Sequence, residues 1–176
     1  MVRYIAFLRG INVGGQKLIK MEKLGRAFTS FGLKNVRTYI QSGNVIFDAA
    51  DKNPAVLTQK IEKKLHKLLG YNVNVLLRTF REVEDIVKRN PFKGIKPAAD
   101  IKMYVTFLSK EPAVKLKIPL KSSKEGLEVS RIDNRDAFIL SRMVKGRFGF
   151  PNNFLEKELG GPATTRNWTT VNKVIK

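Results

Sequence analysis

Residues 4–15, YIAFLRGINVGG, pass from a short apolar run into a loop that contains three glycines. An apolar run of this length is typical of a strand buried in the middle of a sheet. A helical pattern follows the loop, in which Met21, Leu24, Phe28 and Phe31 recur at intervals of three and four residues. The stretch therefore predicts a buried strand, a glycine-rich loop and a helix, in that order.

The chain up to residue 78 continues as a β-α-β-β-α-β series. Residues 36–40 and 44–48, rich in β-branched and aromatic side chains, flank Gln41-Ser42-Gly43 and predict a hairpin. Pro54 suits the first turn of a second helix, and residues 73–77 are expected to form another strand. This order is typical of the split β-α-β, or ferredoxin-like, arrangement of an α+β fold, in which helices cover one face of an antiparallel sheet.

The rest of the chain has a weaker pattern. Thr79 and Glu82 have the spacing of a capping box for a third helix. Prolines and many lysines leave residues 109–125 unassigned. A strand, a crossover, a hairpin and helices partly echo the first half, so a duplicated architecture is one alternative. We expect two α+β subdomains, residues 1–90 and 91–176. Strands of the second are expected at residues 103–108, 127–132 and 137–143.

Composition narrows the possible functions. The net charge of +19 attracts polyanions such as nucleic acid. Because the basic excess is spread along the chain, general basicity is an alternative explanation. The absence of cysteine excludes disulfides, thiol nucleophiles and thiolate metal sites. We expect no cofactor, no metal and no membrane partner, and a cytoplasmic location, because neither a secretory signal nor a membrane-spanning segment is recognised.

The first candidate site follows from the expected strand order. In the split β-α-β arrangement, the loop after the first strand and the hairpin after the second emerge at the same end of the sheet. The first helix is expected to start there too, and its unpaired amides favour an anion. The residues expected to contact a ligand are Arg9, Gly10, Asn12, Gly14, Gly15, Gln41, Ser42 and Asn44.

Each residue type has a chemical reason in this interpretation. The glycines would let backbone amides approach a phosphate or carboxylate, Arg9 would bind it in a bidentate manner, and Asn12 or Ser42 would add neutral hydrogen bonds. The structural alternative is strong, since glycine and Ser-Gly-Asn are ordinary in turns. The loop matches neither the dinucleotide fingerprint nor the P-loop pattern.

A second candidate site lies near the end of the chain. Thr165, Arg166 and Asn167 are expected in the first turn of the last helix, where anions are favoured, with Thr165 as the N-cap. No catalytic residue is selected, because the only histidine, His66, lies beside a lysine-rich helix face and is expected to be a solvated surface residue.

Three motifs of this chain resemble signatures of the bacterial family of unknown function DUF1697. They are RYIAFLRGINVGG at residues 3–15, TYIQSGNVIF at 38–47 and ATTRNW at 163–168. The resemblance covers nearly the whole chain and implies a small intracellular α+β protein. It also implies that the two loops and the final segment are characteristic positions, and it implies no activity.

Three functions remain open from the sequence. The first is binding of a phosphate-bearing ligand, either a nucleotide or nucleic acid, at the edge formed by residues 9–15 and 41–44. The second is an enzyme that acts on a small anionic metabolite at the same edge. The third is a structural or interaction domain that binds neither kind of ligand.

Overall fold

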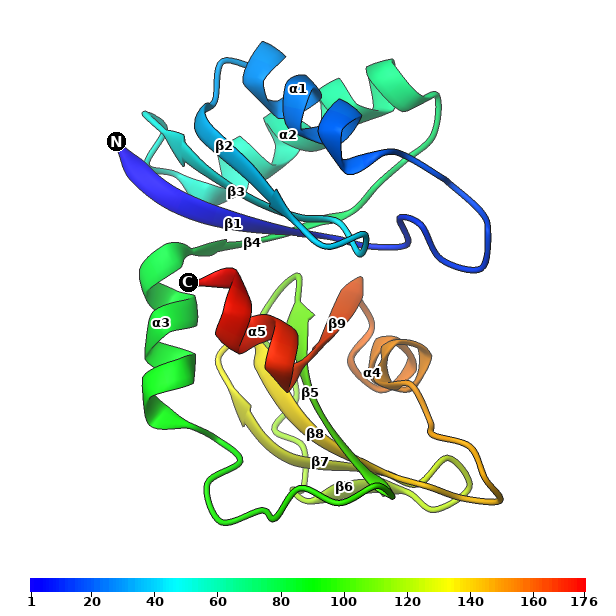
Figure 1. The fold of residues 1–176 in the computed structure, drawn as a ribbon. Helices are drawn as coiled ribbons and strands as arrows, with labels where there is room; N and C mark the ends of the chain where they lie inside the picture. The colour runs from blue at the N-terminus through cyan, green and yellow to red at the C-terminus, as the bar shows by residue number, and fades with distance from the viewer. The chain divides into compact units, whose positions relative to one another are not determined.

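Two antiparallel sheets organise the chain in a computed structural model that describes residues 1–176 (Figure 1). The chain divides into one unit of Met1–Asp85 with Ile175, and another of Ile86–Val174 with Lys176. Both units combine helices with an antiparallel sheet, so the expected α+β class is confirmed. No helix has the length and apolar character needed to cross a membrane.

The first unit is built on a sheet of four strands in the order β2-β3-β1-β4, with every neighbouring pair antiparallel. Because β3 pairs with both β1 and β2, the latter two strands run parallel and end on the same side. The strands are β1 (Val2–Leu8), β2 (Lys34–Tyr39), β3 (Asn44–Ala49) and β4 (Val75–Thr79); the helices are α1 (Met21–Ser30) and α2 (Pro54–Leu69), followed by α3 (Phe80–Arg89).

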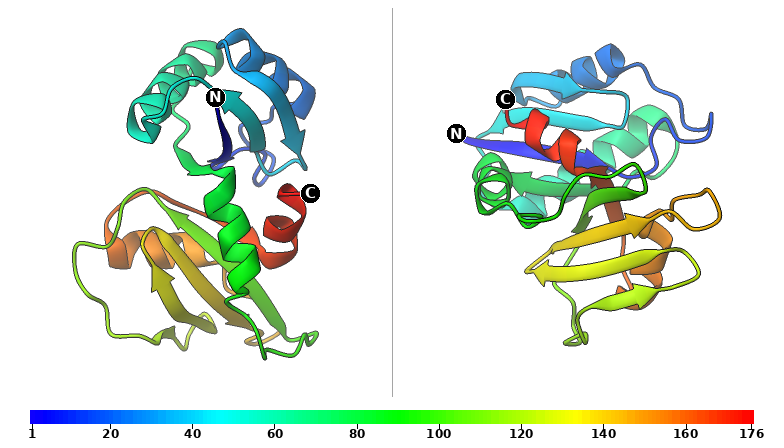
Figure 2. Two further views of the ribbon diagram at one scale, coloured as in Figure 1. Left: turned by 90° about the vertical axis from the view of Figure 1, so that its left-hand side faces the viewer. Right: turned by 60° about the horizontal axis from the view of Figure 1, so that its bottom comes forward.

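One face of this sheet carries the core of the first unit. Helices α1 and α2 lie on the same side of the sheet, as Figure 1 and Figure 2 both show. Tyr4, Ala6 and Leu8 of β1 belong to the buried cluster that also contains Phe28 of α1 and Phe47 of β3. The period of two along β1 is what places alternate side chains on this face.

Local sequence signals define the ends of the helices. The Asn53 side chain accepts hydrogen bonds from the amides of Ala55 (3.0 Å) and Val56 (3.3 Å) and caps α2. Gly70 ends the same helix in the left-handed conformation, with φ of 79°. The capping box of α3 is confirmed: the Thr79 amide donates to the Glu82 carboxylate at 2.6 Å and the Glu82 amide donates to Oγ1 of Thr79 at 3.2 Å.

The second unit repeats this strand order with one addition. Its sheet has the order β6-β7-β8-β5-β9, so that β7-β8-β5-β9 corresponds to β2-β3-β1-β4. Helix α4 lies between the last two strands in sequence, as α2 does in the first unit, and packs on the sheet through Leu155. The elements are β5 (Ile101–Leu108), β6 (Leu120–Ser122), β7 (Leu127–Asp133), β8 (Asp136–Arg142), α4 (Pro151–Leu159), β9 (Ala163–Asn167) and α5 (Trp168–Val174).

The prediction that Thr165 caps the last helix is wrong. Residues 163–167 form β9, in which Thr165 pairs with Thr106 of β5, and α5 begins only at Trp168. Thr164 and Thr165 are β-branched residues that fit a pleated strand, and pairing with β5 supplies their backbone with partners. Tertiary pairing thus overrides the local N-cap signal.

Asp48 connects three strands of the first unit at its surface. Its carboxylate accepts hydrogen bonds from Nε of Arg3 in β1 at 2.9 Å and from Nδ2 of Asn35 in β2 at 2.7 Å. These hydrogen bonds, with Arg3 the larger contributor, lower the pKa of Asp48 below its ordinary value. Folding therefore favours the ionised carboxylate, which links the stability of this unit to pH.

Phe28→Ala should lower the free energy of unfolding by about 3–5 kcal/mol, because it empties a fully buried position beside the Phe47 ring. Urea denaturation followed by circular dichroism measures this change. Lys23→Ala, at an exposed position of the same helix, is the matched control and should shift stability by less than about 0.5 kcal/mol. Equal effects of both variants would contradict the proposed core.

Asp48→Asn should destabilise the protein by about 1 kcal/mol at neutral pH, because the pair with half-exposed Arg3 is weak but is supported by Asn35. Since the pKa of Asp48 is lowered by folding, its contribution is complete above about pH 4 and disappears as pH falls through the folded-state pKa. Denaturation of both proteins between neutral and acidic pH should therefore show converging stabilities. Asp100→Asn, an exposed control, should show no such convergence.

Candidate functional site

The two loops of the first candidate site are neighbours, as the strand order predicted. The amide of Leu8, at the end of β1, donates to the carbonyl of Gly43 in the β2–β3 turn at 2.8 Å. Gly43 has φ of 77°, and a Cβ there would lie 3.1 Å from Cβ of Leu8. Glycine is therefore required both by the backbone conformation and by the close approach of the two segments. In Figure 1 both bends lie at the same end of the first sheet.

Asn12 ties the glycine-rich loop to that turn. Its side-chain Nδ2 donates to the carbonyls of Gln41 (2.8 Å) and Ile19 (3.0 Å), and its Oδ1 accepts from the Ile19 amide at 2.7 Å. Its φ of 55° lies in the left-handed region, which asparagine tolerates better than most residues. The carboxamide of Asn12 is thus occupied within the loop, where it determines loop shape rather than facing a ligand.

The turn residues are used in a similar way. Asn44 is fully buried, and its Nδ2 donates to the carbonyl of Tyr39 at 2.9 Å and to Oγ of Ser42 at 3.0 Å. Ile40 adopts φ of 48°, a strained conformation for a β-branched residue. The hydrogen bonds from Asn12 and Asn44 hold this turn in place. The neutral side chains predicted to contact a ligand therefore stabilise the conformation of the two bends.

The exposed part of the site consists of backbone and cations. Gly14 and Gly15, with φ of 59° and 73°, form the tip of a short hairpin closed by a bridge between Val13 and Gln16. Gln41 is exposed as well, while Arg9 and Gly10 are half-buried at the base of the hairpin.

Lys17 and Lys20 follow this tip in the chain and add positive charge to the loop. Both lysines are exposed, and Lys20 immediately precedes α1, whose first turn has no side-chain cap. Nζ of Lys17 lies 5.2 Å from the centroid of the Tyr71 ring. Backbone amides and ammonium groups are thus the accessible groups at this end of the sheet, and both favour an anion.

Tyr71 is a neighbour of the loop that the sequence analysis missed. It precedes β4, and because β4 runs antiparallel to β1, the chain before β4 lies at the end of β1. The Arg9 amide donates to the carbonyl of Asn74 at 2.9 Å, which fixes this third segment beside the loop. The predicted strand order implies that residues 70–74 lie near the loop, but no local motif in these residues indicated a role there.

The second group of predicted site residues lies in the other unit and is largely buried. The hydroxyl of Thr165 donates to Oδ1 of Asn152 at 2.6 Å and lies 2.7 Å from the Thr106 hydroxyl. Nη1 of Arg166 donates to Oγ1 of Thr164 (2.8 Å) and to the carbonyl of Thr165 (2.9 Å). Burial lowers the pKa of Arg166 to about 10.

Arg166 has a counterpart in the first unit. Arg78 occupies the same place in β4, is 1% exposed and donates to the carbonyl of Leu77 at 2.9 Å. Two residues after each arginine an aromatic residue, Phe80 or Trp168, begins a helix. A buried arginine is therefore a repeated feature of the strand-to-helix junction in both units, which favours a structural role for Arg166.

Asn167 differs from its neighbours because it is exposed. Together with Trp168, Met103 and Pro97 it lines a cavity of about 340 Å³. The Trp168 ring also packs edge-on against Phe92 at 5.3 Å, so its first role is in packing. The predicted site residues thus form two groups, one in each unit.

Known proteins support this fold and leave the activity open. A solved structure of a conserved bacterial protein from Streptococcus pneumoniae is similar, with a TM-score of 0.67 and 21% sequence identity over 99% of this chain and 97% of that chain. At this identity the similarity concerns the fold alone. No curated protein matches the chain. The family described as "Protein of unknown function (DUF1697)" matches residues 1–138, and the chain therefore belongs to the DUF1697 family.

Proposed function

We propose that the protein binds a phosphate-bearing ligand, and specifically the phosphate backbone of nucleic acid, at the loop edge of the first unit. The observation that carries the proposal is the glycine hairpin: its exposed Gly14–Gly15 tip is followed by the exposed Lys17 and Lys20, and Asn12 holds the loop to the β2–β3 turn. Ordered backbone amides beside ammonium groups are a common means of binding phosphate.

Nucleic acid is favoured over a small metabolite by the kind of groups that are accessible. A site that recognises a small molecule usually combines an enclosed apolar pocket with a few convergent polar side chains. At this edge Asn12, Ser42 and Asn44 are engaged in hydrogen bonds within the loops, so apart from the exposed Gln41 the groups left for a ligand are cations and main-chain amides. Such groups contact phosphates without reading a base.

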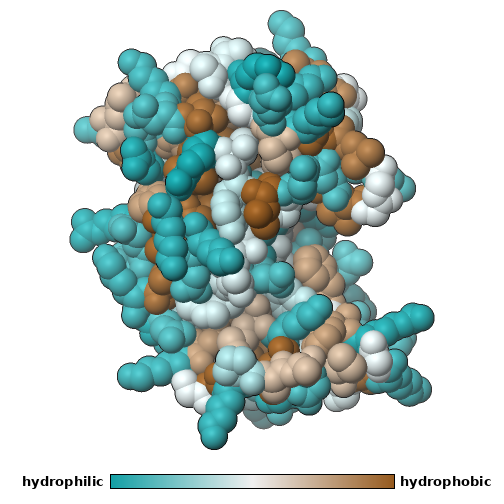
Figure 3. All heavy atoms as spheres, in the orientation of Figure 1, coloured by the Kyte–Doolittle hydropathy of each residue, from teal (hydrophilic) through white to brown (hydrophobic).

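The charge of the whole chain supports the same ligand. The net charge of +19 raises the local concentration of any polyanion and speeds its encounter with the protein. Figure 3 shows hydrophilic side chains scattered over the visible face of the protein. The scattered lysines would attract the nucleic acid without fixing where it binds, and the ordered loop would fix the binding position.

Replacing Lys17 and Lys20 together by Gln should weaken binding of a short labelled oligonucleotide and reduce the salt dependence by up to about two charges, because each lost phosphate contact lowers the slope by about 0.9. Fluorescence anisotropy at a series of salt concentrations measures both quantities. Lys63→Gln with Lys67→Gln, on the exposed side of α2, removes the same charge elsewhere and should have a smaller effect. Equal losses in the two double variants would indicate nonspecific attraction and refute the loop site.

Asn12→Ala tests the loop geometry without changing the charge. It removes the three hydrogen bonds that order the hairpin, so oligonucleotide affinity should fall by about threefold to tenfold because binding must now order the loop. Circular dichroism checks that the fold is kept. Unchanged affinity would contradict the proposal. Displacement of the oligonucleotide by an equimolar mononucleotide would instead indicate a small-metabolite site, and the absence of any binding at low salt would indicate a structural or interaction domain.

A further inference from the structure

The second unit lacks a counterpart of α1. In the first unit the connection from β1 to β2 contains α1, which buries Leu24, Ala27 and Phe28 against the sheet. The corresponding connection from β5 to β7 contains an irregular segment, residues 109–119, and then β6, which extends the edge of the sheet instead of covering its face. Pro112 and Pro119 make a helix in this segment unfavourable.

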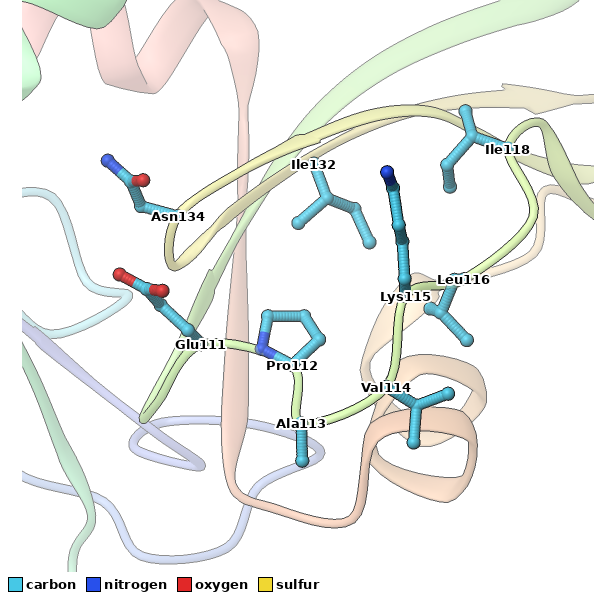
Figure 4. A pocket seen from close by; sticks show the side chains of 9 residues that line it. All are labelled: Glu111, Pro112, Ala113, Val114, Lys115, Leu116, Ile118, Ile132 and Asn134. Carbon is cyan, nitrogen blue, oxygen red and sulfur yellow. The ribbon is translucent and has the colours of Figure 1, made fainter.

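A cavity of about 480 Å³ lies beside β7 in this unit. Its floor includes Ile132 of β7, which packs against the buried cluster on the face that α4 covers. Its walls come from the irregular segment, with Pro112, Leu116 and Ile118 among the apolar residues (Figure 4). The volume is typical of small-molecule sites, and six of the nine lining residues are apolar.

Three polar side chains complete the lining, and they are arranged by charge. In Figure 4, Glu111 and Asn134 lie on one side of Pro112 and Ile132, whereas Lys115 lies on the other side. All three side chains are exposed, and neither Glu111 nor Lys115 has an ion pair or side-chain hydrogen bond within the protein. The cavity therefore offers an acceptor end, an apolar middle and a cationic end.

We propose that this cavity binds a small zwitterion of the ω-amino acid class, in which an apolar chain separates the ammonium group from the carboxylate. The ammonium group of the ligand would meet the Glu111 carboxylate and the Asn134 side-chain oxygen, and its carboxylate would meet the Lys115 ammonium. The apolar chain between them would lie on Pro112, Leu116 and Ile132. The site is independent of the phosphate site in the first unit.

The two opposite charges select against ligands with a single charge. A monocarboxylate of the same shape would satisfy Lys115 but leave Glu111 without a partner, and an amine would do the reverse. The apolar contacts are available to all three ligand types, so the difference among them reports the charged groups alone.

The proposal is tested by following backbone amide signals of the full chain by NMR during titration with 6-aminohexanoate, hexanoate and hexylamine. 6-Aminohexanoate should shift the signals of residues 111–118 and 132–134 and bind more tightly than either analogue. Glu111→Gln and Lys115→Gln should each weaken it by up to about fivefold, as expected for an exposed charge pair. Both positions are exposed, so the variants should remain folded.

Lys117→Gln is the matched control, because Lys117 lies in the same segment but does not line the cavity. It should leave the affinity unchanged. The proposal is overturned if no signal in these two segments shifts at about 10 mM 6-aminohexanoate, if the monocarboxylate binds as tightly as the zwitterion, or if Lys117→Gln weakens binding as much as Lys115→Gln.

Discussion

Strand β1 is the element on which the first unit depends, because it pairs on both sides. It is hydrogen-bonded to β3 along one edge and to β4 along the other, and Tyr4, Ala6 and Leu8 lie in the core beneath the helices. A strand in this position cannot shift by one residue without moving its apolar side chains to the opposite face. The fixed end of β1 brings three loops together that are far apart in sequence.

The same strand order supports two different surfaces. In the first unit α1 covers the sheet, and the chain between β1 and α1 forms the exposed hairpin tip. In the second unit the connection contains prolines and no helix, so that apolar sheet surface borders a cavity instead. Duplication of a strand order therefore conserves the core and allows the connections to diverge, which is where binding residues are commonly found.

Periodicity and capping signals predicted most of the first unit from the sequence. The stripe of α1, Pro54 in the first turn of α2 and the capping box of α3 are local patterns, and local interactions suffice to form them. Pairing in β9 is different, because Thr165 and Arg166 receive their partners from β5, about sixty residues earlier. The repeated arginine at the end of β4 and β9 was also missed, because an arginine and an aromatic residue two positions later are too little similarity to recognise without the strand alignment.

The sequence correctly predicted that the two loops are neighbours, but several of their side chains make other contacts than expected. Residue types indicated Asn12, Ser42 and Asn44 as hydrogen-bonding partners for a ligand, yet their polar atoms satisfy backbone and side-chain groups inside the loops. A bend that contains left-handed residues and a strained Ile40 needs such bonds to keep one conformation. Because these side chains hold the loop, the proposed phosphate recognition falls to the amides and lysines of the loop. A site of that composition would distinguish ligands by charge and by the spacing of phosphates rather than by base identity.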